Sequence, residues 1–145
     1  MSKILIIEAC FYQDIAILLR EGAIDVLNKQ AHEYEIETVP GALEIPAALN
    51  FFISSKQKYD AYVVLGCVIR GETSHYDIVC NESARGVYDL VLKHNLALGN
   101  SILTVENKDQ AIARADPQKK NKGGDAAKAA LHMLELRQKI LIGTG

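Results

Sequence analysis

Short apolar runs and longer amphipathic stretches follow one another along this chain. Lys3–Ala9 and Asp60–Ile69 are almost continuously apolar, as expected for parallel strands that are covered on both faces. We predict a third buried strand at Tyr34–Val39 and a shorter fourth strand at Ser101–Glu106. The chain therefore supplies the strands of a small, largely buried sheet.

Amphipathic helices are predicted where apolar residues recur at steps of three and four. These stretches are Ile15–Leu27, Ile45–Ile53, His75–Leu92 and about Gly124–Ile140. Helices thus alternate with strands, which predicts a parallel sheet with right-handed crossovers and helices on both faces. Such sheets bind ligands beyond the carboxyl ends of their strands. The segments expected there are Glu8–Tyr12, Pro40–Glu44, Arg70–His75 and Glu106–Asn107.

Composition places the chain among ordinary globular proteins. Its 145 residues predict one domain spanning 1–145, and 49% hydrophobic with 23% charged residues argues against disorder. The net charge of −2 removes the electrostatic reason to expect nucleic-acid or membrane-surface partners. The N-terminus lacks the long apolar segment of a signal peptide, and no apolar run approaches the roughly 20 residues that span a bilayer. We therefore expect a soluble, cytoplasmic protein.

The three cysteines, Cys10, Cys67 and Cys80, form no CxxC pair. Neither a disulfide framework nor a zinc site is indicated, so we expect reduced and mostly buried thiols. Three of the four histidines, His32, His94 and His132, lack the spacing of metal ligands. No metal site is therefore predicted.

The segment VIRGETSHYD (68–77) holds the richest chemistry, at the end of the third strand. Gly71 allows a tight turn, Thr73 and Ser74 are good N-cap residues, and His75 falls in the first helical turn. Free N–H groups at a helix start suit a phosphate, and the helix dipole favours a neutral imidazole that can accept a proton. The segment is thus either a phosphate cradle beside a general base or a capped helix start with a surface histidine. The spacing alone leaves both interpretations open.

Three other residues carry two interpretations each. Glu44, in PGALEIP (40–46), either complements a helix dipole or accepts hydrogen bonds from a polyol or amine. Phe11, at a strand end, either packs locally or stacks on a ring. Arg114, in a basic patch with Lys119, Lys120 and Lys122, either faces solvent or binds phosphate as a planar, bidentate donor.

The segments PGALEIP, VIRGETSHYDIVCNESARG and ILTVENKDQAIARA, in this order, resemble the 6,7-dimethyl-8-ribityllumazine synthases. The resemblance extends roughly from Ile4 to Leu136. It implies a flavodoxin-like three-layer α/β/α sandwich around a four-stranded parallel sheet. It also implies a transferase of riboflavin synthesis that needs no metal or organic cofactor. The family condenses 5-amino-6-(D-ribitylamino)uracil with 3,4-dihydroxy-2-butanone 4-phosphate, the penultimate step, releasing phosphate and water.

The resemblance also implies a role for each candidate residue. His75 would transfer protons, Phe11 would stack on the uracil ring, and Glu44 would bind the ribityl chain. The uracil pocket would be lined by Ala42, Leu43, Val68 and Ile69. The phosphate would bind Arg114 and the turn of Gly71, Glu72 and Thr73. Five subunits form a ring in this family, so the adjacent subunit would supply Arg114, Lys122 and the backbone of Asn100.

Three departures from the family pattern affect these expectations. Cys10 replaces an Arg that many relatives carry before the stacking Phe, and Asn100 stands where many carry Phe. ADPQKKNKGG (115–124) replaces a Gly-rich loop that helps pack rings into shells, so we expect an isolated homopentamer, or a decamer of two rings, rather than a closed shell. Two other functions compete. A non-catalytic flavin- or lumazine-binding module would keep a similar pocket, whereas a flavodoxin-like electron carrier lacks support because no FMN-phosphate loop follows the first strand.

Overall fold

The computed structural model describes residues 2–143 and contains one four-stranded sheet in that range. Its strands are β1 (Lys3–Ala9), β2 (Glu33–Val39), β3 (Ala61–Ile69) and β4 (Leu98–Val105). All neighbours pair in parallel, in the order β2-β1-β3-β4. The predicted four-stranded parallel sheet is therefore confirmed.

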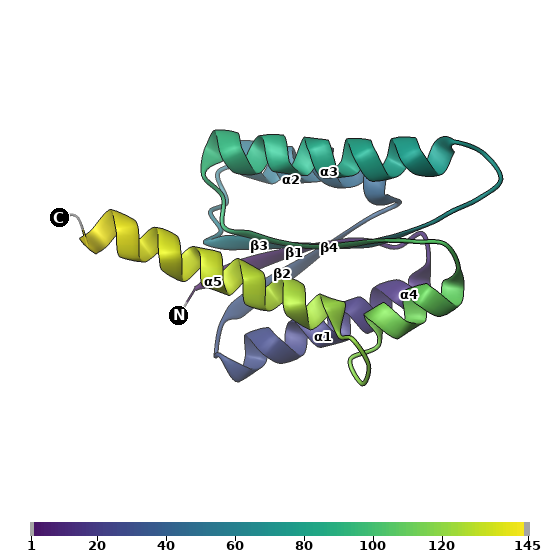
Figure 1. Ribbon diagram of the computed structural model, residues 1–145. Coiled ribbons are helices and arrows are strands. Elements are labelled where there is room, and N and C mark those ends of the chain that lie inside the picture. Colours follow the sequence, from purple (N-terminus) through teal and green to yellow (C-terminus); the bar gives the residue numbers. More distant parts are fainter. Residues whose placement is uncertain (1, 144–145) are drawn as a thin grey trace.

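Helices cover both faces of this sheet (Figure 1). They are α1 (Gln13–Lys29), α2 (Ile45–Ser54), α3 (His75–His94), α4 (Lys108–Ala115) and α5 (Lys122–Gly143). A single 3₁₀ turn, η1 (Ala42–Glu44), precedes α2. In Figure 1, α2 and α3 lie on one face of the sheet, and α1, α4 and α5 lie on the other. The result is the three-layer α/β/α arrangement expected for the flavodoxin-like fold.

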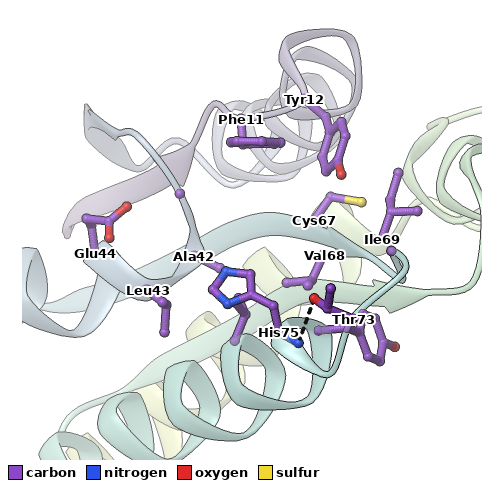
Figure 2. Close-up of a pocket in the computed structure, with 14 residues that line it drawn as sticks. Phe11, Tyr12, Ala42, Leu43, Glu44, Cys67, Val68, Ile69, Thr73 and His75 are labelled. Atoms are coloured by element: carbon purple, nitrogen blue, oxygen red, sulfur yellow. Dashed lines mark hydrogen bonds between the residues drawn. The ribbon is translucent and has the colours of Figure 1, made fainter.

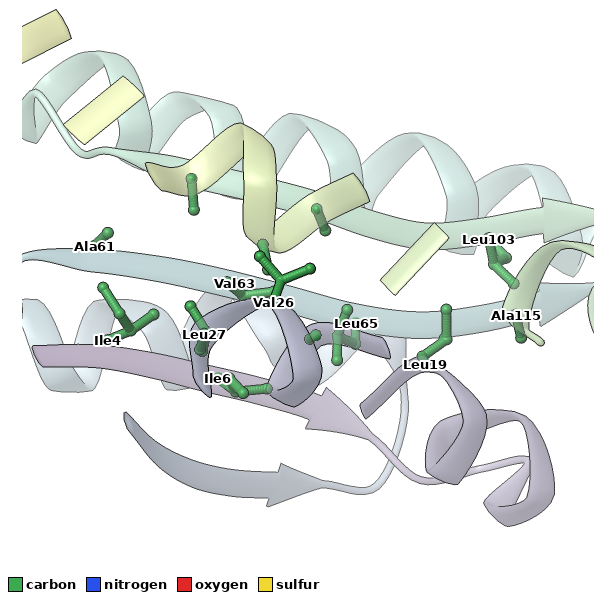
Figure 3. Packing of buried hydrophobic residues seen from close by; sticks show 14 of the residues in the cluster. Ile4, Ile6, Leu19, Val26, Leu27, Ala61, Val63, Leu65, Leu103 and Ala115 are labelled. Carbon is green, nitrogen blue, oxygen red and sulfur yellow. The ribbon is translucent and has the colours of Figure 1, made fainter. Parts of the chain in front are cut away.

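The two faces of the sheet bury separate hydrophobic clusters, because side chains alternate along a strand. In β1, Ile4 and Ile6 belong to one cluster, in which Leu27 of α1 lies beside them (Figure 3). Leu5 and Ile7 pack toward α2 and α3 on the other side. This double burial explains why the first and third strands are continuous apolar runs in the sequence.

Two predicted strands need correction, and one helix was not predicted. β2 is not buried, since it forms an edge of the sheet and its residues are only half-buried or exposed. β4 begins at Leu98 instead of Ser101, because the sheet accommodates Gly99 despite its poor strand propensity. Helix α4 was not among the predicted elements. It has only eight residues, of which only Ala111 and Ala115 are buried, so it has no long apolar stripe.

The strand order creates one switch point. From β1 the chain crosses to β2 on one side, and it then returns to place β3 on the other side of β1. The connections that leave the carboxyl ends of β1 and β3 therefore diverge to opposite faces, which opens a crevice between them. No helix within residues 2–143 is both long and apolar enough to cross a membrane.

Candidate active site

A pocket of about 350 Å³ opens at this switch point, beyond the carboxyl ends of β1 and β3 (Figure 2). Three segments distant in sequence form it: the residues after β1, the η1 turn, and the end of β3 with the turn that starts α3. Its lining residues are Phe11, Tyr12, Gly41, Ala42, Leu43, Glu44, Cys67, Val68, Ile69, Gly71, Thr73, His75, Tyr76 and Val79. Three of the four segments expected at the strand ends thus meet in one pocket.

The turn from Gly71 to Ser74 leads from β3 into α3 and carries His75 at the helix start. Thr73 Oγ1 accepts the backbone N–H of His75 at 3.3 Å, whereas Ser74 forms no capping bond with its side chain. Thr73 is therefore the cap, and Ser74, with φ −71° and ψ 0°, already has a helical backbone. The imidazole of His75 is exposed and lies toward the pocket (Figure 2).

The backbone of the turn does not require glycine at position 71. No described glycine has a positive φ, and a Cβ at Gly71 would meet no atom within 4 Å. The N–H groups of the turn, from Gly71 to Ser74, have no hydrogen-bond acceptor within residues 2–143. They are available to an anion that enters from the pocket.

Phe11 presents an aromatic surface on the other side of the pocket from His75 (Figure 2). Its side chain is 72% exposed, although it packs edge-on against Tyr12 with ring centroids 4.9 Å apart. An exposed aromatic ring that lines a cavity can stack on a planar ligand, because offset stacking needs one free face.

The η1 turn supplies the third wall. Ala42 is buried, while Leu43 and Glu44 remain exposed along the pocket. A Cβ at Gly41 would lie 3.2 Å from Glu44 Oε1, so glycine leaves room for this carboxylate to fold back over the turn. Glu44 also directly precedes α2, with Pro46 in the first helical turn as expected.

Burial shapes the acid–base behaviour of two pocket residues. The pKa of the Cys67 thiol is raised to about 12, first by burial and then by the charge of Asp14. Burial likewise raises the pKa of Tyr76. Both side chains therefore stay protonated at neutral pH and act as neutral walls of the pocket. Cys10 and Cys80 are half-buried free thiols, so only Cys67 meets the expectation of a buried thiol.

Four expected site residues do not line this pocket. Asn100 pairs with Val64 in the middle of the sheet, five positions before Val105, and its side chain accepts the N–H of Ile102. Arg114 lies on α4 and donates to Gln110 O at 3.1 Å, and Lys122 begins α5. Glu72 lies between two lining residues but is not one itself. The pocket of one chain is thus an incomplete version of the expected site.

Five lining residues were absent from the predicted site: Tyr12, Gly41, Cys67, Tyr76 and Val79. Each is close in sequence to a predicted residue, so the rule that ligands bind at strand ends would have found most of them. Within residues 2–143, no cluster of three or more His, Cys, Asp or Glu side chains has a geometry that could hold a metal ion.

Comparison with known proteins identifies the relatives of this chain. A sequence model of the 6,7-dimethyl-8-ribityllumazine synthase family matches residues 1–138. The chain belongs to this family. The 6,7-dimethyl-8-ribityllumazine synthase of Zymomonas mobilis subsp. mobilis is 56% identical over 140 residues, covering 97% of this chain and 99% of the relative. That of Sphingopyxis alaskensis is 53% identical over 143 residues, with 99% and 100% coverage. Membership agrees with the resemblance inferred from the three sequence segments.

Proposed function

We propose that this member of the lumazine synthase family condenses 5-amino-6-(D-ribitylamino)uracil with 3,4-dihydroxy-2-butanone 4-phosphate. The products are 6,7-dimethyl-8-ribityllumazine, phosphate and water. The single observation that carries this proposal is the meeting of Phe11, Glu44 and His75 in one pocket at the switch point of the sheet. A stacking ring, a hydrogen-bond acceptor and a proton acceptor are the groups that this pair of substrates requires.

The uracil ring stacks on Phe11 and is enclosed by the apolar wall of Ala42, Leu43, Val68 and Ile69. Glu44 accepts hydrogen bonds from the ribityl hydroxyls, because its carboxylate is exposed at the edge of the pocket. The phosphate of the second substrate lies at the turn of Gly71, Glu72 and Thr73, where backbone N–H groups are available.

The chemistry follows from these positions. The amine of the uracil substrate attacks the ketone, and loss of water forms an imine. His75 removes a proton from the adjacent carbon, which allows the phosphate to leave with the electrons of its C–O bond. Ring closure by the second amine and loss of water complete the pteridine ring. Holding the two substrates together supplies much of the acceleration, and His75 adds roughly 10²–10⁴-fold.

The site is completed by an adjacent subunit of a homopentamer. Three observations support this part of the proposal. Arg114, Lys122 and Asn100 do not line the pocket of their own chain, and Arg114 forms no ion pair within residues 2–143. The pocket is not enclosed by its own chain. Large apolar side chains are exposed on the outer helices, among them Phe51 and Leu92, at 70% and 79% exposure. The protein would act in the cytoplasm as a pentamer or as a pair of pentamers.

A direct assay tests the reaction. Purified protein is mixed with both substrates, and formation of the fluorescent lumazine is followed after the uncatalysed condensation has been subtracted. A saturable rate well above background is expected, and His75→Ala should lower this rate while leaving ligand binding largely intact. Binding without any rate above background would favour the non-catalytic binding module instead.

Subunit mixing tests the shared site. His75→Ala and Arg114→Gln should each be much slower than the unaltered chain as homo-oligomers. If one pocket uses His75 of one subunit and Arg114 of the next, co-refolded mixtures will regain activity at sites that combine two intact residues. Mixtures without any recovery would place both residues in the same subunit's site.

Sedimentation tests the size of the assembly. A mass near that of a closed shell would contradict the proposed pentamer or decamer.

A further inference from the structure

The turn that carries His75 is exposed and is held only at its two ends. Residues 71–75 are all exposed, so no buried side chain within the turn fixes its position. Before the turn, the N–H of Arg70 donates to Val105 O at 3.0 Å and extends the pairing of β3 with β4. After the turn, Tyr76 packs against the small cluster of Ala42, Val68 and Val79. The geometry of the turn therefore depends on how these two ends are tied together.

The side chain of Arg70 connects the two ends of this turn. Its guanidinium carbon lies 4.3 Å from the centroid of the Tyr76 ring, which is within the range of a cation–π contact. Its Nε lies 2.6 Å from Glu106 Oε2, and its Nη1 lies 3.9 Å from Asp77 Oδ1. One side chain thus joins the start of the turn, the end of β4 and the first turn of α3.

Arg70 is poorly placed to bind the substrate itself. It does not line the pocket, and two carboxylates already neutralise its charge. Its guanidinium contacts the Tyr76 ring while Nε donates to Glu106, a combination that the compact ammonium of a lysine does not reproduce.

We propose that Arg70, held by Glu106, is a positioning residue that keeps His75 and the N–H groups of the turn in the geometry needed for catalysis. This inference rests on the proposed function, because it assigns Arg70 a task in that reaction. Misplacement of a catalytic group by about 1 Å can lower a rate by two orders of magnitude.

Kinetics of four variants test the inference. Arg70→Gln and Glu106→Gln should each lower kcat about tenfold, with KM for the phosphate-bearing substrate changing by less than about threefold. The double variant should be no slower than the worse single variant, because both substitutions remove the same contact. Arg70→Lys should recover little of the lost kcat.

A direct phosphate contact by Arg70 would give the opposite pattern. Arg70→Gln would then raise KM for the phosphate-bearing substrate, and Arg70→Lys would restore it. Glu106→Gln would lower that KM, because it removes a carboxylate that competes with the phosphate for Arg70. This pattern would overturn the inference.

Amide hydrogen exchange gives a readout that does not depend on activity. Exchange across residues 70–77 should be severalfold faster in Arg70→Gln and Glu106→Gln than in the unaltered chain. Arg85→Gln is the matched control, since Arg85 pairs with Glu82 and Asp89 on the same helix at 2.8 and 3.1 Å and lies outside the pocket. Unchanged exchange in both test variants would overturn the inference. Absence of any condensation by the unaltered chain would overturn only the proposed function.

Discussion

The carboxylate of Glu8 lies 3.0 Å from the guanidinium of Arg20, and this ion pair joins β1 to α1. The Glu8 side chain is only 4% exposed, whereas that of Arg20 is 33% exposed. Burial raises the pKa of Glu8, and the charge and hydrogen bond of Arg20 act in the opposite direction. The Glu8 carboxyl group thus lies among buried side chains, in the strand that leads to Phe11.

Arg20→Met should destabilise the protein by roughly 2 kcal/mol near neutral pH, because it leaves the buried carboxylate without a partner. The raised pKa of Glu8 means that the folded chain binds a proton more readily than the unfolded chain, so stability falls as pH rises above about 4.5. The loss caused by Arg20→Met should therefore shrink in acid, where the carboxyl becomes neutral. Urea unfolding at about pH 7.5 and about pH 4 measures both effects.

Lys29→Met is the control for that prediction. It breaks a 2.9 Å pair with Asp25 on the same helix, but both of these side chains are well exposed. The unfolding free energy should hardly change. An equal loss of unfolding free energy in Arg20→Met and Lys29→Met would show that burial of Glu8 does not strengthen its dependence on Arg20.

Gly99→Ala should prevent stable folding or cost at least about 3 kcal/mol. A Cβ at Gly99 would overlap the backbone carbonyl of Ala126, so β4 and α5 would have to separate. Gly71→Ala is the matched substitution, because a Cβ there meets nothing within 4 Å. Its melting temperature should equal that of the unaltered chain. A stable Gly99→Ala protein would show that α5 packs differently.

Cys67 should resist thiol reagents in the native protein at about pH 8. Its side chain is buried, and burial raises its pKa to about 12, so little thiolate is available. Mass spectrometry after timed alkylation should find Cys67 unmodified until the protein is unfolded in denaturant. Labelling of native Cys67 as fast as Cys10, which is half-buried, would contradict this prediction.

Ionisation of Tyr59 should lower the stability of the folded protein at alkaline pH. Its hydroxyl donates to Glu35 Oε2, and burial together with this bond raises the pKa of Tyr59 to about 12 from 10.0. Between these values the unfolded chain loses a proton that the folded chain keeps, so stability falls as pH rises from 10 to 12. Tyr59→Phe should show a shallower decline over this range in denaturant unfolding. An unchanged slope would assign the alkaline loss to other groups.

Phe11→Ala should weaken binding of the uracil substrate about tenfold or more, while stability changes little. The ring is 72% exposed and therefore adds little to the core, but it lines the pocket. Ile17→Ala is the control, since Ile17 is also an exposed apolar side chain, at 44%, and lies outside the pocket. Calorimetric titration with the uracil substrate measures both variants. Equal affinity in the two would contradict stacking on Phe11.

Much of the fold was predictable from local patterns. β1 and β3 were predicted to within one residue, because a strand buried on both faces is apolar at almost every position. α4 escaped prediction since two buried alanines leave no apolar periodicity, although Asn107 caps its start by accepting the N–H of Gln110 at 2.9 Å. Asn107, a favourable N-cap residue, was the sequence signal that could have predicted the start of α4.

The sequence by itself determined the alternation of strands and helices, the family, and the segments that follow the strands. Only the tertiary structure decided which of these segments share a pocket, because strand order and register are set by packing between residues far apart in the chain. The contact of Arg70 with Glu106, 36 positions later, exists because β3 and β4 pair in register from Tyr62 with Leu98 to Ile69 with Val105. Local propensity carries no information about that pairing, whereas burial of both faces of the sheet does.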